Sequence, residues 1–340
     1  MGLVRSHLLD LPSLLLSKIG IKLFTLEKVS LKCIVLLLIQ LIVVIMSMVI
    51  LKDFRTVNPD IWITTVAGSQ SSIKMFVILT QKQKFFEIGE IVNNLDLRRN
   101  CEQAFTKEQK DFKRFFANLQ LIYIFIIITG LTALAVKPIV LKERSLPSPW
   151  YPVCDIQTSI TCYVTCYMIL CITGIILVII LLSVDLLFWS MLAYAYLEME
   201  CIKYKLLHLR IDKNASGDDA NSLSQIASCV KHHNQVLTLI EKINHSYSGM
   251  LIYQCLVTLF VVGMSQFCLT ATGSTPSLPI MLAYIPPYLA GFIQMFGYCF
   301  FGNIIIEQWS IYSSQKVSVI QLIMQIGGPK VNLSSQKLLC

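Results

Sequence analysis

Charged residues are scarce in this sequence of 340 amino acids. They make up 14% of it, whereas an ordinary soluble protein carries about 25%. Apolar residues make up 55%, and the mean hydropathy is positive at +0.66. A chain this apolar cannot cover its surface with polar groups in water. The composition therefore excludes an ordinary soluble domain and indicates a protein of the lipid bilayer.

Catalytic and metal-binding motifs are also absent. The sequence has no HExxH, no GxSxG, no Walker loop and no GxGxxG. Its five histidines are not spaced with carboxylates for catalysis or metal binding, and its twelve cysteines form no CxxC pair. No series of acidic residues inside the apolar runs indicates a proton relay or a sodium-coupled transporter. We therefore expect no enzymatic activity, no cofactor and no metal.

Long apolar runs are what the sequence does contain. A membrane-spanning helix needs roughly 20 mainly apolar residues. Five runs of about that length hold no Asp, Glu, Lys or Arg: Cys33–Leu51, Leu119–Ala135, Tyr163–Val184, Gly249–Ala271 and Pro279–Phe301. With a sixth, Ile61–Thr80, they predict an all-α, polytopic membrane helical bundle of six transmembrane helices.

The sixth run is unusual because polar residues lie at its centre. These residues are Ser69, Gln70, Ser71, Ser72 and Lys74. Inside a bilayer, such a stretch is tolerated only where protein or a water-filled cavity surrounds it. We therefore predict that this second helix forms a cavity wall. Lys74 has two interpretations: it snorkels toward the interface, or it is a buried, paired charge.

The loops carry an uneven distribution of basic residues. With the N-terminus inside, twenty-two Lys and Arg fall on the inner side and five on the outer side, Lys74 set aside. Because basic loops stay in the cytoplasm, this predicts a cytoplasmic N-terminus, the reverse of a G-protein-coupled receptor. The net charge of +8 follows from this distribution, so we expect contact with membrane lipid and no nucleic-acid partner.

Three regions follow from this topology. We expect a cytoplasmic segment over 1–32, a transmembrane core with cytoplasmic helical loops over 33–302, and a cytoplasmic anchor-like segment over 303–340. After Val184 the apolar spacing continues into charged sequence, and "SLSQIASCVKHHNQVLTLIEKINHSYSGM" repeats it before the fifth helix. The two stretches predict cytoplasmic helical extensions. Their apolar faces need either a bundle shared between subunits or the inner leaflet.

The outer loop over 136–162 contains "LPSPWYPVCD". Its prolines make it stiff, and its aromatic residues suit the membrane interface. It either rests on the headgroups or covers a cavity among the outer helix ends. Cys154 and Cys162 lie on this oxidising side, where a disulfide bridge is possible.

Small polar and aromatic side chains gather toward the outer ends of helices two to five. A mostly apolar cavity with a few such groups is what a small volatile or lipid-like ligand needs. Helix packing in membranes uses the same residue types, so packing is the alternative interpretation. The candidate ligand-binding residues are Trp62, Thr65, Ser69, Thr129, Thr132, Tyr163, Cys166, Tyr167, Met264 and Phe267.

The chain resembles the insect odorant receptor family over nearly its whole length. The motifs are the outer "LPSPWYP", the histidines of "CVKHHNQVL" and, most specifically, "YCFFGNIIIEQ" at the end of helix six. The residues that carry the resemblance are Trp150, Tyr151, Pro152, His232, His233, Tyr298, Cys299, Gly302 and Asn303.

The resemblance implies a subunit of a heteromeric, ligand-gated cation channel in olfactory signalling. Its partners would be a small volatile ligand and the shared olfactory co-receptor, and its location the plasma membrane of sensory neuron dendrites. The ligand would bind among the outer halves of helices two to six, and cytoplasmic extensions would form an anchor between subunits.

In one respect the chain departs from the family pattern. The family continues into a seventh, pore-lining helix, whereas this sequence ends at Cys340, where that helix should begin. We therefore expect a truncated gene model or splice product. The alternatives to an odorant receptor subunit are a gustatory-type chemoreceptor and a multi-pass transporter or scaffold for lipid-like molecules.

Overall fold

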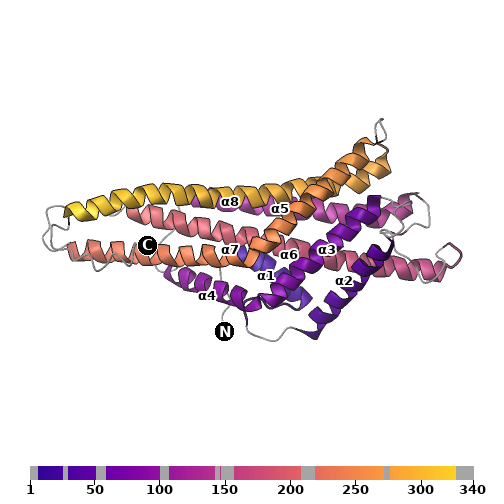
Figure 1. The fold of residues 1–340 in the computed structure, drawn as a ribbon, viewed down its shortest axis with the longest axis horizontal. Coiled ribbons are helices and arrows are strands. Elements are labelled where there is room, and N and C mark those ends of the chain that lie inside the picture. Colours follow the sequence, from indigo (N-terminus) through magenta and orange to yellow (C-terminus); the bar gives the residue numbers. More distant parts are fainter. Residues whose placement is uncertain are drawn as a thin grey trace.

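The computed structural model describes residues 7–25, 30–50, 59–99, 107–141, 146, 157–207, 219–271 and 276–326. Within these ranges the protein is all helical and contains no strand. The helices are α1 (His7–Ile19), α2 (Leu31–Ile50), α3 (Pro59–Thr80), α4 (Lys82–Arg99), α5 (Lys107–Leu141), α6 (Ile160–Leu207), α7 (Asp219–Thr270) and α8 (Leu278–Ile326). They form an elongated bundle (Figure 1).

Four helices in the described part of the chain are long and apolar enough to cross a membrane. They are Lys107–Val136, Ile160–Lys205, Ser224–Thr270 and Ile280–Gln308. In α2 a shorter apolar stretch, Cys33–Ile42, is found. The predicted helical membrane bundle is therefore confirmed in outline, while the count of six spans stays a prediction.

Three helices far exceed the length that a membrane requires. In α6 there are 48 residues, in α7 52 and in α8 49, against roughly 20 for one crossing. The end of α6, the start of α7 and the end of α8 extend together beyond α2 and α3 (Figure 1). The continuous helices agree with the apolar spacing after Val184 and before the fifth run.

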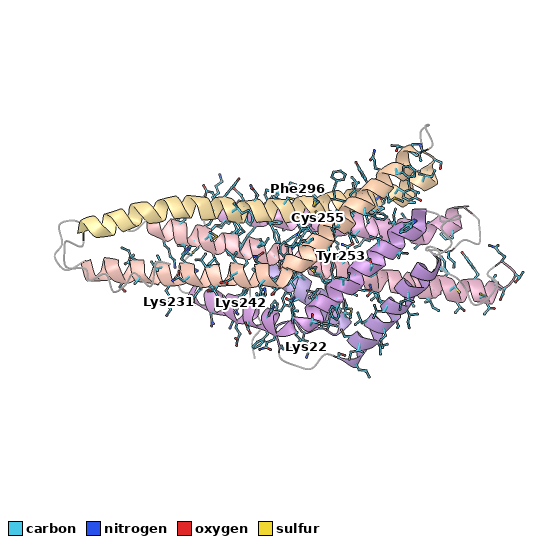
Figure 2. All side chains as sticks on the ribbon, viewed as in Figure 1. Lys22, Lys231, Lys242, Tyr253, Cys255 and Phe296 are labelled. Atoms are coloured by element: carbon cyan, nitrogen blue, oxygen red, sulfur yellow. The ribbon has the colours of Figure 1, made fainter. Side chains whose placement is uncertain are left out.

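Two helices were not predicted. In α1 the residues Leu9, Leu16 and Ile19 are buried, because their spacing brings them to one face, which packs on α6. Helix α4 packs against α7, where Glu87 forms an ion pair with Lys242. Lys242 lies on the half of α7 that precedes Tyr253 (Figure 2). The segment over 1–32 therefore contributes a helix to the bundle.

The core of the bundle is centred on α6. Nearly every side chain of this helix between Ile180 and Ile202 is buried, so other elements surround the helix on all sides. Trp189 is fully buried there and packs against Tyr123, Tyr298 and Phe301. A Cβ at Gly297 of α8 would lie 2.3 Å from the Trp189 ring, so only glycine permits this close approach.

One disulfide partner is visible at the start of α6. Cys162 is disulfide-bonded. Cys154 lies outside the described residues, as do Trp150, Tyr151 and Pro152 of the outer loop.

Candidate functional site

An apolar cavity of about 230 Å³ lies among α2, α3, α5, α6 and α8. Most of the side chains that line it are aliphatic, and its polar lining residues are Gln40, Cys171, Thr173 and Tyr284. The predicted role of α3 as a cavity wall is confirmed, since Ile63, Ala67 and Gly68 line the space. The wall residues of α3 are apolar or small, however, and differ from the polar ones that prompted the prediction.

Small and cyclic residues create the space. Gly130 and Gly174 line the cavity on α5 and α6. A Cβ at Gly130 would lie 3.0 Å from Pro286, and one at Gly174 would lie 3.2 Å from Leu131. Pro286 and Pro287 line it on α8 and lie inside that helix. A proline has no N–H to donate to the carbonyl four residues earlier, so the helix loses two hydrogen bonds at this point.

None of the ten predicted ligand-binding residues lines this cavity. Several are engaged elsewhere: Trp62 packs on Phe260 at 6.1 Å between ring centroids, and Ser69 bonds Tyr253 at 2.8 Å. The Tyr167 hydroxyl donates to the Ala135 carbonyl at 2.6 Å.

The remaining seven residues fall into three groups. Thr65 and Cys166 are buried, Tyr163 and Met264 are half-buried, and Thr129, Thr132 and Phe267 are exposed. Three of the four expected helices, α3, α5 and α6, do line the cavity, and α8 takes the place expected for α7. The contact of the ten residues with a ligand stays a prediction.

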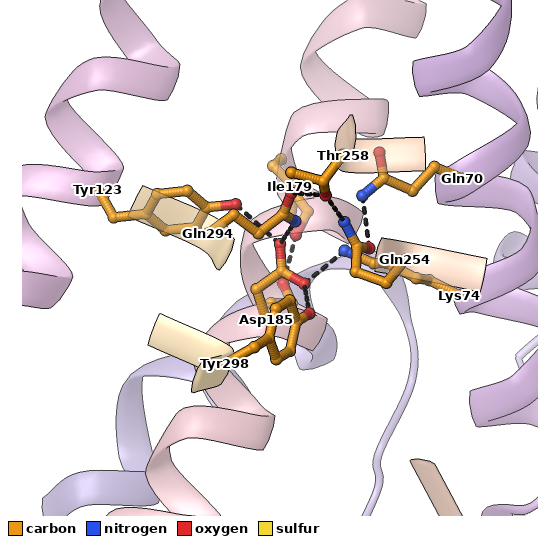
Figure 3. Close-up of polar contacts among 10 residues, drawn as sticks. Gln70, Lys74, Tyr123, Ile179, Asp185, Gln254, Thr258, Gln294 and Tyr298 are labelled. Atoms are coloured by element: carbon orange, nitrogen blue, oxygen red, sulfur yellow. Dashed lines mark hydrogen bonds and ion pairs between the residues drawn. The ribbon is translucent and has the colours of Figure 1, made fainter. Parts of the chain in front are cut away.

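A buried polar network lies next to the cavity and is centred on Asp185 of α6 (Figure 3). The Asp185 carboxylate is 0% exposed and forms an ion pair with Lys74 of α3. It accepts hydrogen bonds from Tyr123 at 2.8 Å, from Gln294 Nε2 at 2.6 Å, and from the Tyr298 hydroxyl. Four donors on three other helices thus satisfy one carboxylate.

The network continues through α7 and back to α3. Thr258 donates to Gln294 Oε1 at 3.2 Å and accepts from Gln254 Nε2 at 2.8 Å. Gln70 Nε2 donates to Gln254 Oε1 at 2.6 Å. The polar side chains of α3 are therefore matched by partners on other helices, so the network links α3, α5, α6, α7 and α8 (Figure 3).

Lys74 is a buried, paired charge. Its side chain is 1% exposed, which rules out the snorkelling interpretation. Its partner Asp185 was missed, because it follows directly on the apolar run that ended at Val184. A lone acidic residue between "LLSV" and "LLFW" was the available signal, since charges in such surroundings are rare unless they are paired.

The network and the cavity are one helical turn apart. On three helices a cavity residue and a network residue are separated by four positions: Leu181 and Asp185 on α6, Ala290 and Gln294 on α8, and Ile127 and Tyr123 on α5. Four positions correspond to about one turn on the same face. The polar network therefore closes one end of the apolar cavity.

None of the motif residues of the long helices lines the 230 Å³ cavity. His232 Nε2 is 3.0 Å from Glu198 Oε2, and His233 is buried beside it. Tyr298 belongs to the network. Cys299 and Gly302 line a second cavity of about 360 Å³ among α6, α7 and α8. Asn303 donates to Glu307 at 2.8 Å on the exposed face of α8.

Comparisons with known proteins agree with this architecture. A family model described as 7tm Odorant receptor matches residues 61–313, a range that includes every residue lining the 230 Å³ cavity except Gln40. The structure is similar to that of the insect olfactory receptor OR5 from Machilis hrabei, with a TM-score of 0.71 and 14% identity, over 88% of this chain and 79% of that chain. No curated protein matches the chain. Because the family model covers well over half of the sequence, this multi-pass membrane protein belongs to the odorant receptor family.

Proposed function

We propose that this odorant receptor subunit binds a small, largely apolar molecule in the cavity among α2, α3, α5, α6 and α8. The observation that carries the proposal is the cavity itself, which is lined mostly by aliphatic side chains and holds few polar groups. An apolar cavity of about 150 Å³ is large enough for benzene. At about 230 Å³, the cavity has room for a molecule of roughly nine carbon atoms.

The subunit acts, in this proposal, within a hetero-oligomeric, ligand-gated cation channel in the plasma membrane of olfactory neuron dendrites. Its partner is the olfactory co-receptor. Membership of the odorant receptor family supports this assignment. The joint extension of α6, α7 and α8 beyond the other helices supports it as well, because it offers a surface for contact between subunits (Figure 1).

We further propose six membrane spans, with α2 and α3 as the first two and the N-terminus in the cytoplasm. The hydrogen bonds and the ion pair of α3 support its crossing, because Lys74, Gln70 and Ser69 all have partners and so avoid the cost of unpaired polar groups in lipid. An epitope tag at the N-terminus should bind antibody only after permeabilisation. Binding on intact cells would contradict this topology.

A homologous series of ligands tests the proposed site. We expect the unfolding temperature of the purified protein to rise as linear ligands lengthen from roughly six carbons, until the ligand becomes too long for the cavity at roughly nine to twelve carbons. A ligand at a hundredfold its Kd stabilises the folded state by about 2.7 kcal/mol. In cells that also express the co-receptor, the sizes of the odorant-evoked currents should follow the same order across the series.

The expected loss of stabilisation by the longest ligands distinguishes binding in the cavity from non-specific partitioning. Partitioning into detergent or lipid grows steadily with each added methylene, by about 0.8 kcal/mol. A response that rises throughout the series, or no response from any member, would contradict a site of this size.

A further inference from the structure

Gln40 of α2 has an unusual place in the cavity wall. It lines the cavity, yet its side chain is only 2% exposed. The amide Nε2 donates to Ser71 Oγ of α3. The other end, Oε1, is buried and accepts no hydrogen bond from the residues that the structure describes. A buried acceptor without a donor is costly, so a group that donates to it would be bound favourably.

Further groups of the cavity wall also offer acceptors. The Thr173 hydroxyl already donates to the Ile169 carbonyl at 2.7 Å, which leaves its oxygen lone pairs. Pro286 and Pro287 cannot donate to the carbonyls of Leu282 and Ala283, and Ala283 lines the cavity. The cavity wall thus offers several acceptors to the O–H group of a ligand.

We infer that the cavity selects molecules that carry one hydroxyl group on an apolar body, and that Gln40 is the residue that binds the hydroxyl. This inference rests on the proposed function. The ligand O–H donates to Gln40 Oε1. A turn about the soft last torsion of the side chain brings this oxygen toward the cavity, and the same turn releases Nε2 from Ser71. A molecule that only accepts hydrogen bonds leaves Oε1 unpaired, so it binds less tightly.

An isomeric pair of probes isolates the hydroxyl. The alcohol 1-octanol and the ether 1-methoxyheptane have the same atoms and nearly the same shape, but only the alcohol donates a hydrogen bond. Binding of each is measured from the rise in unfolding temperature of purified full-length protein. We expect the wild type to bind the alcohol about tenfold more tightly than the ether.

A matched pair of variants assigns the preference to one residue. Gln40→Met keeps the length of the side chain and removes the amide, so the alcohol-to-ether ratio should fall by about tenfold while ether binding persists. Gln120→Met is the control, because Gln120 is also buried but bonds Ser190 and does not line the cavity. The control should keep the wild-type ratio, and comparing ratios cancels any difference in how the two probes partition.

The possible outcomes distinguish the hydroxyl-binding role of Gln40 from the proposed binding of apolar ligands in the cavity. An unchanged ratio in Gln40→Met would overturn the role of Gln40, and so would equal binding of both isomers by the wild type. If hydrocarbons of the same length still bind, the proposed cavity stands without hydroxyl selection; if nothing binds, both fail. Should Gln40→Met not fold, Gln40→Asn withdraws the amide by one methylene and should lower the ratio in the same direction.

Discussion

Replacing Lys74 by methionine is expected to destabilise the folded protein by about 3–5 kcal/mol. The substitution removes the cation paired with Asp185 and leaves a carboxylate that is 0% exposed in the middle of the bundle. Tyr123, Gln294 and Tyr298 still donate hydrogen bonds to it, but they carry no charge. The free energy of unfolding, from denaturant titration of the purified protein in detergent, measures the loss.

Two further variants show whether the uncompensated charge is the cause. The double variant Lys74→Met with Asp185→Asn removes both charges and keeps an acceptor for the neighbouring donors, so it should recover most of the lost stability. Arg114→Met breaks an exposed pair with Asp111, whose atoms are 3.8 Å apart, and should change stability by less than about 0.5 kcal/mol. A loss in Lys74→Met no greater than that in Arg114→Met would refute the buried pair.

Filling the cavity is expected to remove ligand binding while the protein stays folded. Ala67 on α3 and Ala290 on α8 both line it. Leucines at both positions would occupy the space that the ligand needs, and forcing a ligand in beside them costs at least about 2 kcal/mol. Affinity for the best ligand of the homologous series should therefore fall by at least about thirtyfold. The rise in unfolding temperature with ligand measures it.

The control for filling the cavity is an alanine-to-leucine substitution outside it, on α5. Ala117 is exposed and does not line the cavity, so Ala117→Leu should leave the affinity as it is. Should the filled variant bind as tightly as Ala117→Leu, the ligand would have to lie outside this cavity, and the second cavity beside Cys299 would be the next candidate.

Hydrophobic patterning was enough to predict the class of fold. Long uncharged runs require helices in lipid, and the described part of the chain is helical throughout. The pattern was less informative for α1 and α4, which lie beside the apolar runs. In α4 many side chains are charged or carry amides, and these do not favour burial by themselves. The positions of both helices depend on contacts with α6 and α7, which are distant in sequence.

The polar residues of α3 were informative in a different way from the one expected. Their presence in an apolar run correctly signalled that α3 is surrounded by protein. The lysine and glutamine in it are engaged with Asp185 and Gln254, and those partners lie 111 and 184 residues away in sequence. No single-sequence pattern identifies pairs at such separations.

The cavity itself could not be predicted from polarity. We chose residues such as Thr129 and Thr132 because their side chains carry hydroxyls, but both hydroxyls donate to the backbone of their own helix. The space arises instead where side chains are small or cyclic, at Gly130, Gly174 and Pro286. Such residues also serve helix packing in membranes, so they do not mark a ligand site in the sequence.

The location of a bound ligand is the central claim, and a density map of the protein saturated with the best member of the homologous series tests it most directly. The account predicts ligand density between Ala67, Leu131, Gly174 and Ala290, with its polar end toward Gln40 and the Asp185 network one helical turn away. Density in the second cavity beside Tyr298 and Cys299, with the first cavity empty, would contradict it.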